Sequence, residues 1–223
     1  MPESLTNRIL VAGASRGVGR EIARSLVNQG YSVTGLIRSA SIAPELQALG
    51  LETAIVDALN AQQVEASING FDAVISTIGS LPQDGKLVDY DGNKNLIDAA
   101  IKANVRKFVL VSSIGAGESA VALPPQALET LKSVLVEKEK AEQYLIKSGL
   151  TYTIVRPGGL KSEPATGNAV LTEDPKIAGS IHRADVADLV CRCLTSDRAA
   201  QKTLSAVDRN MLYGTPAFEE FIP

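Results

Sequence analysis

The chain has 223 residues, of which 45% are hydrophobic and 21% are charged, and its formal net charge is −3. This length suffices for one domain with a sizeable core, while the lack of a basic excess argues against nucleic acid as the main partner. No apolar run approaches the roughly 20 residues of a membrane-spanning helix. The single histidine argues against a multi-histidine metal site or a Ser-His-Asp triad, and we expect no metal.

The compartment is inferred from the N-terminus and the cysteines. Residues 1–4 lack the basic and apolar regions of a signal peptide. Cys191 and Cys193 lie two residues apart on a predicted helix, so they point in different directions and can hardly form a disulfide. Both observations fit a reducing compartment, most simply the cytoplasm. No long additional interface helix is predicted, which slightly favours a monomer.

Short apolar runs alternate with helical patterns along the chain. Strands are predicted at residues 9–12, 32–37, 51–56, 73–77, 108–111, 152–155 and 203–207. Helices are predicted after the glycines that follow the first strand, and at residues 44–49, 61–68, 88–103, 127–147 and 183–194. Loops cover residues 81–86 and, with one or two short strands, 160–181. The alternation predicts a single α/β domain over residues 1–223. It is a Rossmann-type, doubly wound, mainly parallel sheet with helices on both faces, with a core at about 8–207 and an aperiodic tail at 208–223.

A glycine-rich turn links the first predicted strand to the first helix. Gly13, Gly17 and Gly19 let the backbone turn sharply and approach a pyrophosphate closely, while free N–H groups and the helix dipole attract its charge. Three glycines alone are a weak signal, but here they stand at the strand-to-helix turn where the mechanism needs them. We therefore interpret the turn as a phosphate cradle, with an ordinary glycine-rich turn as the alternative.

The residues that end the predicted strands should carry function, because ligands of such sheets bind beyond the carboxyl ends of the strands. Asp57 ends the third strand and could accept a hydrogen bond from an adenine amino group; alternatively, it caps the helix after Ala58. The small backbone of residues 77–79 ends the fourth strand, where it can lie along a cofactor.

The second strand ends at Arg38, where a site for NAD would normally have a carboxylate for the ribose 2′-hydroxyl. Arg38 suits a 2′-phosphate, and Arg16 in the glycine turn could clamp this group from the other side. We therefore predict NADPH over NADH by at least about tenfold. The alternative for both arginines is a solvated surface charge.

These motifs together resemble the short-chain dehydrogenase/reductase family. Residues 13–19 look like its glycine motif, and residues 111–113 look like its serine-bearing fifth strand. Residues 148–160 resemble a segment typical of the atypical, NmrA-like branch, which includes NADPH-dependent flavin reductases, biliverdin-IXβ reductases and plant and cyanobacterial proteins of uncertain substrate. The similarity covers about residues 8–207. It implies that residues 157–160 lie over the nicotinamide.

One departure from the family pattern concerns the general acid. Conventional members have a tyrosine four residues before a lysine on the helix after the fifth strand, and this tyrosine passes a proton to a carbonyl. The best lysine match here is Lys140, with Val136 four residues earlier; Lys138 as the match is preceded by Val134. Tyr144 lies one turn on the wrong side of Lys140, where packing or solvent exposure is the alternative role. The sequence therefore predicts no tyrosine-based proton relay.

Ser113 is the catalytic candidate that remains. It shares a strand face with residues 109 and 111, and it could hydrogen-bond the carboxamide or a bound water; capping a loop is the alternative. Lys140 could hold the nicotinamide ribose, or be solvated. His182 is interpreted as a residue at a helix start, and Arg183 and Asp185 as capping and surface charges. The predicted cofactor-binding residues are Gly13, Ser15, Arg16, Gly17, Val18, Gly19, Arg38, Asp57, Ala58, Thr77, Ile78, Gly79, Ser112, Lys140, Pro157, Gly158, Gly159 and Leu160.

These features favour an NADPH-dependent reductase. A hydride donor without a strong protein acid suits planar conjugated acceptors that solvent can protonate, such as flavins, linear tetrapyrroles or quinones. A flavin would then be a substrate and not a prosthetic group. The alternative is a binding module that senses or scaffolds through NADP(H) without turnover. A third reading, an epimerase or lyase with permanently bound NADP, would need an acidic group that the sequence does not reveal.

Overall fold

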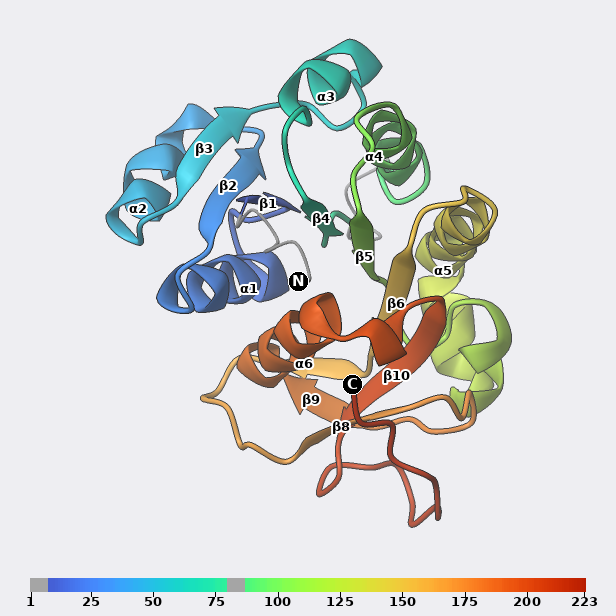
Figure 1. Cartoon of the computed structure of the whole chain (residues 1–223). Coiled ribbons are helices and arrows are strands. Elements are labelled where there is room, and N and C mark those ends of the chain that lie inside the picture. Colours follow the sequence, from blue (N-terminus) through green and yellow to red (C-terminus); the bar gives the residue numbers. More distant parts are fainter. Residues whose placement is uncertain (1–7, 80–86) are drawn as a thin grey trace.

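The structure is a computed structural model, which describes residues 8–79 and 87–223. One eight-stranded sheet runs through its centre in the order β3-β2-β1-β4-β5-β6-β10-β8 (Figure 1). Its strands are β1 Arg8–Ala12, β2 Ser32–Ile37, β3 Glu52–Ile55, β4 Ala73–Ser76, β5 Lys107–Val111, β6 Tyr152–Pro157, β8 Ala169–Thr172 and β10 Lys202–Asp208. All neighbours pair in parallel except β8 and β10, which are antiparallel. The predicted Rossmann-type fold class is confirmed.

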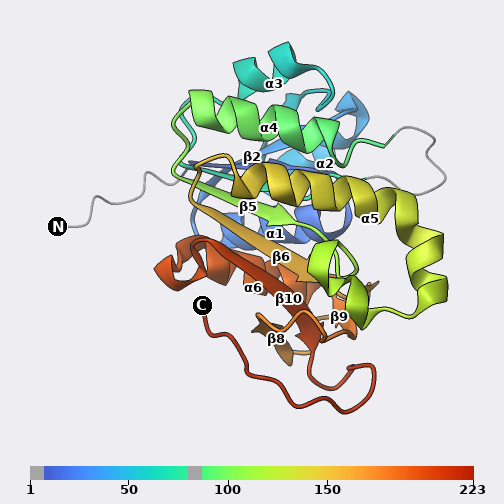
Figure 2. The ribbon, with the colours of Figure 1, turned by 90° about the vertical axis from the view of Figure 1, so that its right-hand side faces the viewer.

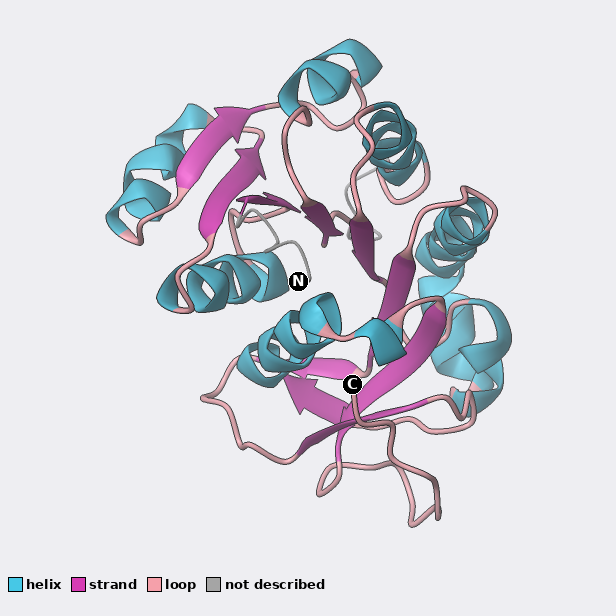
Figure 3. Ribbon diagram, viewed as in Figure 1, coloured by secondary structure: helices cyan, strands magenta, loops and turns pink. Residues whose placement is uncertain are grey.

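Helices cover both faces of this sheet (Figure 3). The helices are α1 Gly17–Asn28, α2 Ala43–Ala48, α3 Ala61–Ser67, α4 Asp91–Lys102, α5 Pro125–Ile146 and α6 Arg183–Thr195. Helices α1, α2 and α6 bury apolar residues on one face, and α3, α4 and α5 do so on the other. Figure 2 shows α4 and α5 lying across the second face. None of the helices in the described residues is long and apolar enough to cross a membrane.

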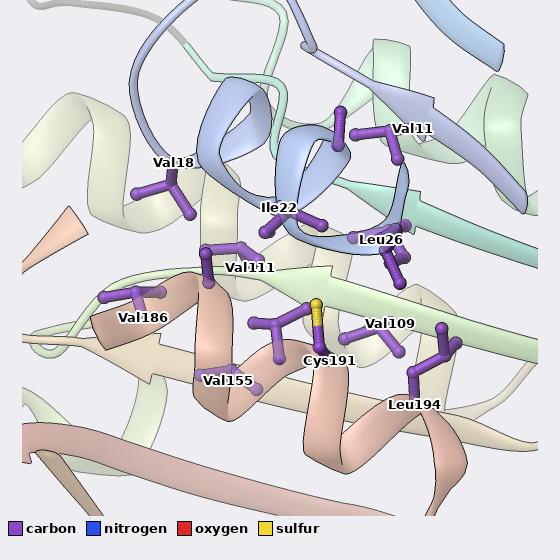
Figure 4. Close-up of a cluster of buried hydrophobic side chains, with 14 of the residues drawn as sticks. Val11, Val18, Ile22, Leu26, Val109, Val111, Val155, Val186, Cys191 and Leu194 are labelled. Atoms are coloured by element: carbon purple, nitrogen blue, oxygen red, sulfur yellow. The ribbon is translucent and has the colours of Figure 1, made fainter. Parts of the chain in front are cut away.

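The core between α1, α6 and the sheet explains the apolar pattern of the strands. Figure 4 shows Ile22 of α1 and Cys191 of α6 pointing into this layer together with Val109 of β5. Phe108 and Leu110 of the same strand pack on the opposite face, as the alternation of side chains in a strand requires. Cys191 is therefore a buried core residue with a free thiol, and so is Cys193.

The carboxyl edge of the sheet carries a small additional layer. Strands β7 Gly159–Lys161 and β9 Ser180–His182 form a separate two-stranded parallel sheet. The tail is held by two isolated bridges, one between Leu212 and Gly179, which directly precedes β9, and one between Phe221 and Leu171 of β8 in the main sheet. The aperiodic tail is thus held by backbone pairing with residues far away in the chain.

Most predicted elements occur within a residue or two of their expected bounds. The sixth strand includes Pro157, which pairs with Ala206 and ends the strand one residue later than a proline break would. Proline has no N–H to donate to the ladder, but its carbonyl still accepts from the N–H of Ile114. The helix predicted at 88–103 begins only at Asp91. The loop predicted at 81–86 lies outside the described residues.

Candidate functional site

The turn between β1 and α1 is as tightly packed as a phosphate cradle requires. Gly13 has φ +88°, and a Cβ atom there would lie 2.5 Å from the Thr77 hydroxyl oxygen. A Cβ on Gly19 would collide with the carbonyl oxygen of Gly13. Thr77 holds the turn from the neighbouring strand, because its hydroxyl donates to the carbonyl of Ala12 at 3.0 Å. Only glycine fits at residues 13 and 19 without moving this backbone.

The first turn of α1 presents unsatisfied backbone donors at this place. Arg16 is the N-cap with extended backbone, no side chain in the described part of the chain caps the helix, and no acidic residue lies in its first turn. The first N–H groups of a helix have no intrahelical partner and attract anions. Gly17 is exposed beside them. The cradle therefore fits a diphosphate.

Arg38 follows the last residue of β2 on the same edge as the glycine turn. The β1–β2 register pairs Ala12 with Leu36, so Arg38 lies just beyond the point where β1 enters the turn. Arg16 and Arg38 are both exposed, and neither forms an ion pair within residues 8–79 and 87–223. Their predicted contact with a 2′-phosphate stays a prediction.

Asp57 does not cap the following helix, so the alternative role considered for it is wrong. Asn60 is the N-cap of α3, and its side chain accepts a hydrogen bond from the N–H of Gln63 at 3.1 Å. Asp57 is exposed and accepts from the N–H of Leu59 at 3.0 Å. The carbonyl of Ala58 accepts from Asn95 Nδ2 at 2.9 Å. These bonds fix the turn after β3, and the predicted adenine contact stays a prediction.

The two candidate lysines of α5 point to different places. Lys138 Nζ lies 2.9 Å from Asp89 Oδ1, and a Cβ on Gly79 would be 3.1 Å from the same nitrogen. Lys140 is exposed and pairs with Glu137 at 2.6 Å, which raises its pKa. Residues two apart on a helix face nearly opposite directions. The structure thus places Lys138 at the carboxyl end of β4, whereas the predicted cofactor contact of Lys140 has no geometric support.

No tyrosine of α5 stands beside this lysine. Val134, one turn before Lys138, is buried, and Val136 is 44% exposed. Tyr144 donates to Asp98 Oδ1 at 2.6 Å, and its ring meets Tyr90 edge-on, so it links α5 to α4. The bond to Asp98 raises the pKa of Tyr144. The packing role considered for Tyr144 is the observed one.

The two serines after β5 differ in their hydrogen bonding. Ser112 is buried, and its Oγ has no partner among the described residues. Ser113 is half-buried, and its hydroxyl donates to the carbonyl of Ile114 at 3.0 Å. A buried hydroxyl without a partner costs free energy. Ser112 is therefore a candidate to bind a polar group at this edge.

Residues 157–160 close the edge on the β6 side. The carbonyl of Pro157 accepts from the N–H of Ile114 at 3.0 Å. A Cβ on Gly158 would collide with the carbonyl of Gly179. The close approach of these two backbone segments is therefore a sufficient reason for a glycine at residue 158. Gly159 and Leu160 are exposed on β7.

Asp185 is not a surface charge, as the sequence suggested, because it is 3% exposed. It accepts hydrogen bonds from the N–H groups of Thr166 and Gly167 at 2.9 and 3.0 Å. His182 and Asp208 lie beside it, with ligand-type atoms of the three residues within 4.8 Å of one another. Asp208 accepts from the hydroxyl of Thr166 and from the N–H of Asn210. Both carboxylates are thus used to hold the loop between β7 and β8.

Comparison with known proteins agrees with this geometry. A model of the NAD(P)H-binding family matches residues 13–197. The chain belongs to this family. The chain is 36% identical to an uncharacterised chloroplast protein of Arabidopsis thaliana, over 92% of this chain and 78% of that protein. It is 34% identical to the chloroplast protein TIC 62 of Pisum sativum, over 82% of this chain but only 39% of that protein. Among solved structures, the anaerobilin reductase ChuY of Escherichia coli O157:H7 matches with a TM-score of 0.83. It is 30% identical, over 94% of this chain and all of ChuY.

Two further residues of this NAD(P)H-binding chain lie at the site, although neither was predicted from the sequence to be a site residue. Arg183, the first residue of α6, reaches the glycine turn near Gly17. Tyr213 of the tail is 56% exposed, and its hydroxyl lies 3.3 Å from Ser180 Oγ, beside Gly159. Neither contact leaves a periodic signal in the sequence, because each is made between segments that lie far apart along the chain.

Proposed function

We propose that this NAD(P)H-binding protein is an NADPH-dependent reductase that acts on a planar conjugated acceptor. Bound NADPH would supply the hydride. The observation that carries the proposal is the pair Val134 and Lys138, because a lysine faces the β4 end while a residue without a proton stands one turn before it. Such a site suits acceptors that take their proton from solvent, namely tetrapyrroles, flavins or quinones.

The choice of NADPH rests on the end of β2. No carboxylate stands there, and Arg38 and Arg16 are exposed cations without an ion pair among the described residues. A 2′-phosphate would satisfy both guanidinium groups by charge-assisted hydrogen bonds. NADH has a neutral 2′-hydroxyl in place of this phosphate, so it would leave both guanidinium groups without an anionic partner.

A tetrapyrrole is the acceptor to test first. ChuY is described as an anaerobilin reductase, and it aligns with this chain over almost its whole length at 30% identity. The residues named here would act as follows: the α1 N-terminus binds the diphosphate, Lys138 orients the ribose, and Ser112 with Ser113 orients the reacting ring. Proton delivery would come from water.

The experiment is a panel of acceptors under NADPH. The purified full chain is mixed with NADPH and, separately, with biliverdin, a flavin and a quinone, and the loss of NADPH absorbance is followed. Reduction of at least one acceptor, abolished in Gly19→Val, is the expected result. Arg24→Ala, a substitution on the exposed side of the same helix, is the matched control and should leave the reduction unchanged.

The second candidate function is NADP(H) binding without turnover. It is favoured by the bond from Ser113 to the carbonyl of Ile114, which turns the only predicted catalytic hydroxyl toward the backbone. The same panel tests it, since tight NADPH binding without reduction of any acceptor is the expected behaviour of a sensor or scaffold.

A further inference from the structure

The first turns of α1 and α6 lie close together at the edge that holds the glycine turn. Val18 of α1 and Val186 of α6 belong to one buried cluster, and Figure 4 shows both at the same end of the layer between the helices and the sheet. The residue that begins each helix therefore faces the same edge. These residues are Gly17 and Arg183.

Arg183 extends over the glycine turn. A Cβ placed on Gly17 would lie 3.7 Å from Arg183 Nε and 3.9 Å from its Cδ. Because Gly17 has φ +58° and no side chain, the guanidinium approaches the backbone of the first α1 turn directly. Any anion bound by the N–H groups of that turn lies within reach of this cation.

Neighbouring residues hold Arg183 in place without neutralising it. Its Nη1 donates to Ser162 Oγ at 2.7 Å and to the carbonyl of Leu160 at 3.5 Å. Both partners are neutral, and no carboxylate of the described residues forms an ion pair with Arg183. The other arginine of α6, Arg192, has a carboxylate partner, Asp188, at 3.9 Å. Arg183 is thus oriented by the segment after β7, with its charge available.

We propose that Arg183 is a diphosphate ligand of the nicotinamide cofactor, supplied from α6 and held by Ser162. This inference rests on the proposed cofactor-binding function and deepens it. The diphosphate carries negative charge that the α1 dipole and its N–H groups only partly balance. A guanidinium beside Gly17 completes this balance and donates to the phosphate oxygens in its planar fork geometry.

Arg183 and Arg38 differ in the cofactor group that each would bind. The diphosphate is common to NADPH and NADH, so loss of Arg183 weakens both by the same factor. The 2′-phosphate occurs only in NADPH, so loss of Arg38 weakens NADPH alone. The ratio of the two affinities therefore separates the two arginines.

The test is a binding titration with the full chain carrying Arg183→Ala. Dissociation constants for NADPH, NADH and adenosine 2′-monophosphate, which has no diphosphate, are measured beside those of the unaltered chain. We expect about 10- to 100-fold weaker binding of both dinucleotides, with an unchanged NADPH/NADH ratio and unchanged binding of the monophosphate. Arg192→Ala on the same helix is the matched control and leaves all three constants unchanged.

Unchanged dinucleotide affinity in Arg183→Ala overturns the inference, and a loss confined to NADPH overturns it by assigning Arg183 to the 2′-phosphate. If the unaltered chain binds neither dinucleotide, the proposed function itself fails. Thermal unfolding of the ligand-free variants reports any folding defect. Should Arg183→Ala fold poorly, Ser162→Ala gives the same answer, with a smaller but equal loss for both dinucleotides expected and no loss contradicting the proposal.

Discussion

Lys138 and Asp89 form an ion pair of 2.9 Å directly beside Gly79, three residues beyond the end of β4. Asp89 is fully buried, and the lysine side chain is 16% exposed. Lys138 is thus anchored by a buried carboxylate at the edge of the sheet that carries the glycine turn. This anchoring gives the lysine both a structural role and a position from which it can orient a ligand.

The first prediction concerns the two lysines of α5. Lys138→Met should lower the free energy of unfolding by about 1.5–3 kcal/mol, because it removes the cation that pairs with the buried carboxylate of Asp89, and it should weaken NADPH binding. Lys140→Met is the control on the exposed side and should leave both quantities unchanged. Urea denaturation and NADPH titration measure them. Equal behaviour of the two variants would remove Lys138 from the site.

The second prediction concerns cofactor choice. Arg38→Ala should reduce the preference for NADPH over NADH by about tenfold or more, since a charge-assisted bond to the 2′-phosphate is lost. The dissociation constants of both cofactors are compared, with Arg24→Ala as an arginine control on α1. An unchanged ratio would show that Arg38 is a solvated charge.

The third prediction concerns Tyr213, the exposed tyrosine beside Gly159. If solvent delivers the proton, Tyr213→Phe changes kcat by less than about twofold, because only the bond to Ser180 is lost. Steady-state kinetics with the best acceptor of the panel measure this. A loss of about 100-fold or more, the size of a general-acid contribution, would identify Tyr213 as the missing acid.

The fourth prediction concerns alkaline stability. Burial raises the pKa of the Cys193 thiol to about 12 from an ordinary value of 9.0. The folded thiol therefore binds its proton more tightly than the unfolded one, so its contribution to stability is complete below pH 9 and is lost as the pH rises toward 12. The contribution falls by at most about 1.4 kcal/mol per pH unit.

Lys107 acts in the opposite direction, since burial lowers its pKa and favours the folded state at higher pH. Comparison with Cys193→Ala isolates the thiol. The difference in free energy of unfolding between the unaltered chain and this variant should shrink steadily above about pH 9 in urea titrations. A difference that is independent of pH up to about pH 11 would contradict the assigned cause.

The layout of the sheet could be predicted from the sequence because each strand and helix has a local periodic signal. The glycine turn could also be predicted, because its three closely spaced glycines stand directly between a predicted strand and a predicted helix. The choice between Lys138 and Lys140 could also have been made, because Lys138 continues the buried stripe of Val134 and Leu145 at helical spacing, whereas Lys140 does not. The position of each lysine relative to the buried stripe of α5 distinguishes the two, whereas the spacing of the family motif does not.

Arg183 and Tyr213 could not be placed in this way. The position of Arg183 depends on the hydrogen bond to Ser162, 21 residues away. That of Tyr213 depends on the bond from its N–H to the carbonyl of Ala178. Such pairings between irregular segments have no periodicity, so only the folded backbone brings these residues to the site. The burial of Asp185 likewise follows from the loop that it holds.

Hydride transfer from NADPH to a conjugated acceptor is tested most directly by an isotope effect in a single turnover. NADPH deuterated at C4 of the nicotinamide, in each of the two configurations, is bound to the full chain and mixed rapidly with the acceptor that the panel identifies. We expect slower NADPH consumption with one configuration and an unchanged rate with the other. Tight binding of NADPH with no consumption under any acceptor would contradict hydride transfer as the function of this chain.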